Sequence, residues 1–147
     1  MQKKQKVVLA AAAAAVLAAV PATLVIQDRV EAAAVAEERK SLELAALKIF
    51  QRDADRPAAY WRTVPAPGGM VWDRAVARAQ LSRVEKEGHQ AKVWVSEITT
   101  PYASDPSGGR RQATTPYAAG HLFVFEPSGD GWRLAKDLTR SELAGNG

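Results

Sequence analysis

The N-terminal end of the chain joins a cationic head to a long stretch without charge. The head reads MQKKQK, and the residues from Val7 to Ile26 are uncharged and mostly alanine, valine and leucine. A run of about 20 such residues is long enough to cross a bilayer as a helix, and a cationic head before it is typical of an export signal. We therefore set residues 1–29 apart and expect a single domain from residues 30–147, which suffice for one modest core.

The export segment has two possible fates. Small residues up to Ala22 suit cleavage by signal peptidase, whereas Thr23 to Ile26 prolong the apolar run and favour a retained anchor. Lysines before the run would hold the N-terminus inside the cell. In both cases we expect the domain to lie outside the cytoplasm, either secreted or tethered to the membrane through residues 7–26.

Composition excludes several classes of function. The chain has no cysteine and two histidines, so we expect no metal site, no cysteine nucleophile and no cofactor. It has 20 Lys and Arg against 16 Asp and Glu, but Lys3, Lys4 and Lys6 precede the apolar run and the remainder is close to balance. Nucleic-acid binding needs basic residues clustered on one face, so we expect no such partner.

The pattern of the domain predicts an α+β fold with one long N-terminal helix packed on a curved antiparallel sheet of about four strands. A helix is expected from Val30 to Arg52, because apolar residues recur there at helical spacing, namely Leu42, Ala45, Ala46, Ile49 and Phe50. The segments KVWVSEI, HLFVFE and GWRLAKDL have strand composition. Residues 71–87 carry both helical and strand patterns, and both possibilities stay open.

The peptide TTPYA occurs twice, from Thr99 to Ala103 and from Thr114 to Ala118. The flanking residues differ, so a duplicated unit is not expected. We interpret the copies as mirror positions in one hairpin, with Tyr102 facing Tyr117. Counting onward sets Ile98, Ser96 and Trp94 against His121, Phe123 and Phe125 on one apolar face.

Three segments resemble a known family, namely Val93 to Tyr102, Thr114 to Phe125, and Gly131 to Leu138. In these segments the chain resembles the non-catalytic N-terminal domain, of the nuclear-transport-factor-like or cystatin-like type, of secreted bacterial amidase-domain proteins. The resemblance implies a cone-shaped α+β module with an accessory role. The family continues into a catalytic domain, which this sequence lacks after AGNG, so a truncated amidase-like protein without activity of its own is one alternative.

The candidate ligand pocket is aromatic. Tyr60, Trp61, Trp72 and His121 could line the concave side of such a sheet, whereas we expect Trp94 and Trp132 to belong to the core. His121 could also act as an acid or base if a carboxylate such as Glu97 or Asp137 oriented it. A hydrogen-bonded packing role is favoured, because no serine stands in a nucleophile motif.

These observations together predict a non-enzymatic binding or accessory module at the bacterial cell envelope. Its partner would be a protein or a cell-wall ligand, which the sequence does not identify. The alternative from another class is a small enzyme that uses His121 within the pocket.

Overall fold

The structure of the chain is a computed structural model that describes the backbone of residues 2–139 and the side chains of residues 29–139. It divides into two compact units, Met1–Glu38 and Arg39–Gly147. Helix α1 (Gln2–Asp55) forms the described part of the first unit and continues into the second. The side chains of the predicted export segment, residues 7–26, lie outside the described residues. In the part of the chain that the structure describes, no helix combines the length and apolar composition that a bilayer crossing requires.

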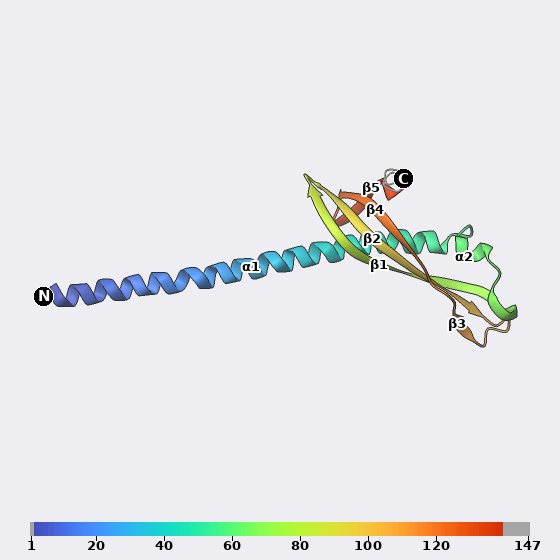
Figure 1. Ribbon diagram of the computed structural model, residues 1–147, viewed down its shortest axis with the longest axis horizontal. Helices are drawn as coiled ribbons and strands as arrows, with labels where there is room; N and C mark the ends of the chain where they lie inside the picture. Colours follow the sequence, from blue (N-terminus) through green and yellow to red (C-terminus); the bar gives the residue numbers. More distant parts are fainter. Residues whose placement is uncertain (1, 140–147) are drawn as a thin grey trace. The chain divides into compact units, whose positions relative to one another are not determined.

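The second unit contains an antiparallel sheet (Figure 1). Its strands are β1 (Val71–Glu87), β2 (Gln90–Ser104), β3 (Arg111–Ala113), β4 (Tyr117–Ser128) and β5 (Gly131–Asp137). The order is β1-β2-β4-β5, and the short β3 pairs with β2 beyond the start of β4. The α+β class is confirmed, and the sheet has one strand more than predicted because the three-residue β3 has no strand pattern of its own.

Residues 71–87, left open by the sequence, form the longest strand. Alanine, arginine and glutamate favour a helix in isolation, but β1 pairs with β2 along almost its whole length. Ala75 and Ala77 are buried on one face. Strand preference depends on packing against neighbours, and here that packing outweighs the local preference for a helix.

Two hairpins close through two-residue turns that begin with glycine. Glu87 pairs with Gln90, and Gly88 between them has φ of 60°. Ser128 pairs with Gly131 in the same way, and Gly129 has φ of 57°. Such turns need a positive φ at their first central residue, which glycine adopts without steric cost. The sequence predicts turns at both places, from Gly88 before His89 and from the segment EPSGDG, and both turns are confirmed.

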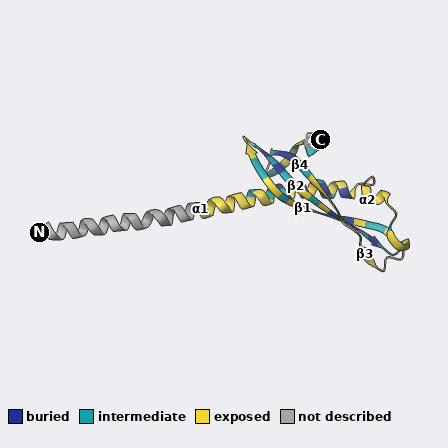
Figure 2. Cartoon of the chain, viewed as in Figure 1, coloured by how far each residue is buried: buried dark blue, intermediate teal, exposed yellow. Residues whose placement is uncertain are grey.

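The part of α1 in the second unit packs one apolar face on the sheet. Leu42, Ala46 and Phe50 are buried at successive helical turns and share a core with buried side chains of β1, β2 and β4. Ala45 and Ile49 pack beside them. Figure 2 shows the buried positions gathered on this part of α1 and on the strands. The predicted helical face is therefore confirmed.

The outer edge of β1 is bound by side chains of α1. The amide nitrogen of Gln51 donates to the carbonyl of Ala75 (2.9 Å), and its amide oxygen accepts from the N–H of Ala77 (2.9 Å). Further along, a carboxylate oxygen of Glu43 accepts from the N–H of Leu81 (3.4 Å). An edge strand otherwise leaves these backbone groups without a protein partner. Gln51 thus takes the place of a neighbouring strand over two residues.

The predicted hairpin register is wrong by three residues, since Tyr117 pairs with Thr99 and not with Tyr102. Tyr102 pairs instead with Ala113 of β3. The turn closes between Asp105 and Arg110, where the N–H of Asp105 donates to the carbonyl of Arg110 (2.9 Å). The first TTPYA copy therefore lies inside β2, whereas the second spans the break between β3 and β4, and the two are not mirror positions.

Because the register shift is an odd number of residues, the side chains of β2 lie on the opposite face of the sheet from the one predicted. Val95 and Val93 lie opposite His121 and Phe123 in the core, whereas Trp94 pairs with Leu122 and turns to the other face of the sheet. Trp94 is half-buried there and not a core residue, contrary to the prediction.

The same change displaces the other predicted partners. Ile98 pairs with Ala118, and Ser96 pairs with Gly120. Trp132 is also only half-buried, at the margin of the core.

Candidate functional site

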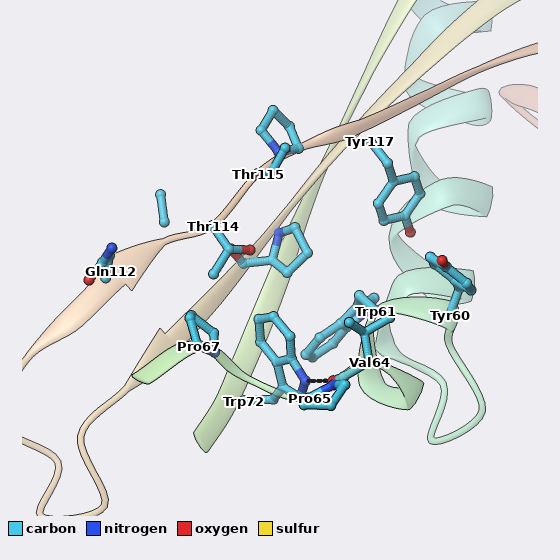
Figure 3. A pocket seen from close by; sticks show the side chains of 13 residues that line it. Tyr60, Trp61, Val64, Pro65, Pro67, Trp72, Gln112, Thr114, Thr115 and Tyr117 are labelled. Atoms are coloured by element: carbon cyan, nitrogen blue, oxygen red, sulfur yellow. Dashed lines mark hydrogen bonds between the residues drawn. The ribbon is translucent and has the colours of Figure 1, made fainter. Parts of the chain in front are cut away.

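A groove of about 550 Å³ opens where the segment after α1 meets the far end of the sheet (Figure 3). Helix α2 (Tyr60–Thr63), the 3-10 turn η1 (Pro67–Gly69) and the start of β1 supply one wall. The other wall comes from β2, β3 and the second TTPYA copy. The lining residues are Tyr60, Trp61, Val64, Pro65, Pro67, Trp72, Pro101, Gln112, Ala113, Thr114, Thr115, Pro116 and Tyr117.

Four aromatic rings define the shape of the groove. Trp61 and Trp72 meet edge to face with ring centroids 5.6 Å apart, and Tyr60 and Tyr117 do so at 6.4 Å. Trp61 is only 2% exposed, whereas Tyr60 is 72% exposed. The indole pair is thus a rigid floor, and Tyr60 is a ring held at the surface.

Both indole N–H groups of the floor donate hydrogen bonds to backbone carbonyls of the protein. Trp61 donates to the carbonyl of Ala54 at 2.8 Å, and Trp72 donates to the carbonyl of Val64 at 2.6 Å. The guanidinium of Arg62 also lies over the Trp61 ring, 4.2 Å from its centroid. These contacts fix both rings and leave neither indole N–H available to a ligand.

The lining carries no formal charge. None of its side chains is Asp, Glu, Lys, Arg or His. Sites of this volume, mainly apolar and with a few polar groups, commonly hold ligands in proteins. The groove therefore suits a ligand that is neutral where it makes contact.

His121 does not share this groove, so the structure brings together Tyr60, Trp61 and Trp72 but not the fourth predicted pocket residue. Its ring lies 4.8 Å from Phe50 and 5.3 Å from Phe123, between centroids. It borders a separate hollow of about 210 Å³, to which Ser82 and Ser96 also contribute.

Of the two carboxylates considered for His121, Glu97 is the partner. His121 Nε2 lies 2.8 Å from Glu97 Oε2, and both side chains are largely buried. The hydroxyl of Thr99 donates to the second oxygen of Glu97 at 2.8 Å. Burial raises the pKa of Glu97, but the hydrogen bonds from His121 and Thr99 and the charge of His121 outweigh it. The pKa therefore lies below the ordinary 4.5.

Tyr117 links this buried network to the groove. Its side chain is hydrogen-bonded to that of Thr99. Burial raises the pKa of Tyr117 above 10.0, the bond with Thr99 offsets part of the rise, and nearby negative charge adds to it. The phenol is therefore neutral and held in place.

The contribution of the repeated motif to the groove was missed. Thr114, Thr115, Pro116 and Tyr117 line it, and the first copy adds Pro101. The recurrence was visible in the sequence, but it was interpreted as a hairpin feature alone. Pro116 lies in the break between β3 and β4, Pro101 lies inside β2, and both belong to the wall of the groove.

Metal binding finds no support in the described residues, among which no group of three or more His, Cys, Asp or Glu side chains could hold an ion. Compared with protein-family models, with curated proteins and with solved structures, the chain shows no match. The resemblance to amidase-associated domains stays a prediction.

Proposed function

We propose that the chain is a non-enzymatic binding or accessory module that acts at the cell envelope, outside the cytoplasm, with the aromatic groove as its binding site. The observation that carries this proposal is the neutral groove, whose ring positions are fixed by internal hydrogen bonds. Preorganised rings bind with little loss of conformational entropy. The cationic head and the apolar run from residue 7 to residue 26 support export or anchoring.

The surroundings of His121 support a packing role. Its ring lies against Phe50 and Phe123, outside the groove, and Glu97 occupies one ring nitrogen. Two serines border the hollow beside His121, and neither is arranged as a nucleophile. Ser82 donates to the carbonyl of Trp94 at 3.1 Å, and Ser96 is exposed. An activated serine would instead share a hydrogen bond with the base.

The small-enzyme alternative rests on the same His121–Glu97 pair, which is the arrangement of an oriented base. A turnover assay separates the two functions. The full chain is incubated with cell-wall fragments and with generic ester and amide substrates, beside the variant His121→Ala. We expect no turnover above the level of the variant. Turnover that disappears in His121→Ala would establish the enzyme and end the binding-module proposal.

A further inference from the structure

We propose that the occupant of the groove is an extended, proline-rich peptide segment of a partner protein. This inference rests on the proposed binding function and names its ligand class. The groove offers aromatic and proline carbon surface, no charge and few polar groups. Aromatic-lined grooves of this kind suit the polyproline II conformation, which is already extended before binding.

The polar side chains that remain available in the groove are few. The Thr114 hydroxyl donates to the carbonyl of Pro101 at 2.9 Å, and the Tyr117 hydroxyl is committed to Thr99. The two indole N–H groups are committed as well. The Tyr60 hydroxyl, the Gln112 amide and the Thr115 hydroxyl remain, and all three can donate.

A proline residue brings one carbonyl acceptor and no N–H donor. A run of prolines therefore presents ring carbon to the aromatic floor and a sparse row of carbonyls to these three donors. Such a ligand has no backbone N–H group that would need an acceptor in the groove.

The placement of the donors also favours an elongated ligand. Figure 3 shows Tyr60 and Tyr117 at one end of the groove and Gln112 at the other, with Trp72 between them. Gln112 and Ala113 belong to β3, which pairs with β2 alone among the described strands.

A neutral glycan fits the same rings less well. A sugar ring carries several hydroxyls, and each one removed from water needs a partner in the site. Three side-chain donors cannot match the hydroxyls of even a short oligosaccharide, and unpaired buried polar groups cost binding free energy. The scarcity of free polar groups thus favours the peptide.

The test is a binding titration of the full chain, labelled with ¹⁵N and followed by NMR. The probe is an acetylated decaproline amide, with a Gly-Ser peptide of equal length and chitotetraose as comparison ligands. We expect saturable shifts of the Trp61 and Trp72 indole signals with decaproline alone. Tyr60→Ala should weaken binding at least about five-fold, because the most exposed aromatic ring of the groove is lost. Tyr60→Phe should weaken it less, because only a donor is removed.

Tyr102→Ala is the control, because it removes another tyrosine ring that does not line the groove. Tyr102 holds in the first TTPYA copy the place that Tyr117 holds in the second. Its affinity should stay within about two-fold of the unmodified chain. Absence of decaproline binding overturns the inference. Groove shifts with chitotetraose instead would leave the binding function standing with another ligand class. Equal loss in Tyr60→Ala and Tyr102→Ala would place decaproline outside the groove and also overturn the inference.

Discussion

Glu97 is the residue on which the buried polar side chains of the sheet converge. His121 and Thr99 each bind one of its oxygens, and Tyr117 binds Thr99 in turn. A carboxylate that accepts hydrogen bonds from two sides is stabilised in its ionised form, which is why its pKa is lowered despite burial. The network therefore stabilises the fold as long as Glu97 keeps its charge.

Replacing Glu97 by glutamine should lower the free energy of unfolding at pH 7 by about 1 to 3 kcal/mol, because hydrogen bonds to a charged acceptor are lost. The folded pKa lies below the unfolded value, so this stabilisation is present above about pH 4.5 and is lost as the pH falls through the folded pKa. Urea unfolding at several pH values measures both effects. The gap between the unmodified chain and Glu97→Gln should close in acid, and the exposed Glu87→Gln should show no such gap. A gap that does not change with pH would contradict the role of the charge.

Two tryptophans should differ in their contribution to stability. Trp61 is 2% exposed and hydrogen-bonded to Ala54, so Trp61→Ala should cost about 3 to 5 kcal/mol. Trp132 is half-buried with Lys86 4.8 Å from its ring centroid, so Trp132→Ala should cost about 2 kcal/mol. The sequence placed Trp132 in the core, and that position would imply a larger cost than its half-burial supports. Denaturant midpoints of the two variants decide the order, and a larger loss in Trp132→Ala would contradict it.

Among the elements, those with a local pattern were predicted and those set by tertiary pairing were not. The buried face of α1 follows from apolar spacing, and the Gly88 and Gly129 turns follow from the freedom of glycine at positive φ. The register of β2 against β4 depends on where the intervening loop closes and on the short β3. A symmetric count between the TTPYA copies could not reveal either, and the error placed Trp94 on the wrong face.

The contact between α1 and β1 gives a prediction at the same scale. Gln51→Ala should destabilise the second unit by about 1 to 2 kcal/mol, because it leaves Ala75 and Ala77 without their partners at the strand edge. Lys48→Ala, an exposed position on the same helix, should change stability by less than about 0.5 kcal/mol. Thermal unfolding of both variants measures the difference, and equal stability would show that water replaces Gln51 without cost.

For the molecule as a whole, part of the site was predictable because residues near in sequence supply it. Trp61 and Trp72 flank the same proline-rich break, and the structure brings them into contact. Tyr117 and Pro101 come from strands whose register was not predictable, so their share in the groove was missed. His121 was assigned to the groove for the same reason, and its partner Glu97 was one of the two carboxylates considered for it.

The expected topology is tested on cells. If residues 7–26 remain as an anchor, the protein should sediment with membranes and resist extraction by high salt and by alkaline carbonate. Protease added from outside should then digest the domain, because the lysines before the run are expected to hold the N-terminus inside. A mature N-terminus at Thr23, found by mass spectrometry, would instead establish cleavage and a secreted protein.

The Gln51 bridge makes one amide of β1 a reporter of helix docking in hydrogen exchange. Amides on an open strand edge exchange quickly with deuterium. Amides that are hydrogen-bonded to a protein acceptor exchange only when local unfolding breaks that bond. Because N–H groups alternate along an antiparallel strand, the N–H of Ala79 points to the same edge as that of Ala77. Of these two N–H groups, Gln51 accepts a hydrogen bond from that of Ala77. Ala77 should therefore exchange far more slowly than Ala79, two residues away. Its exchange rate then measures how often the end of α1 lifts from the sheet while the strands stay paired.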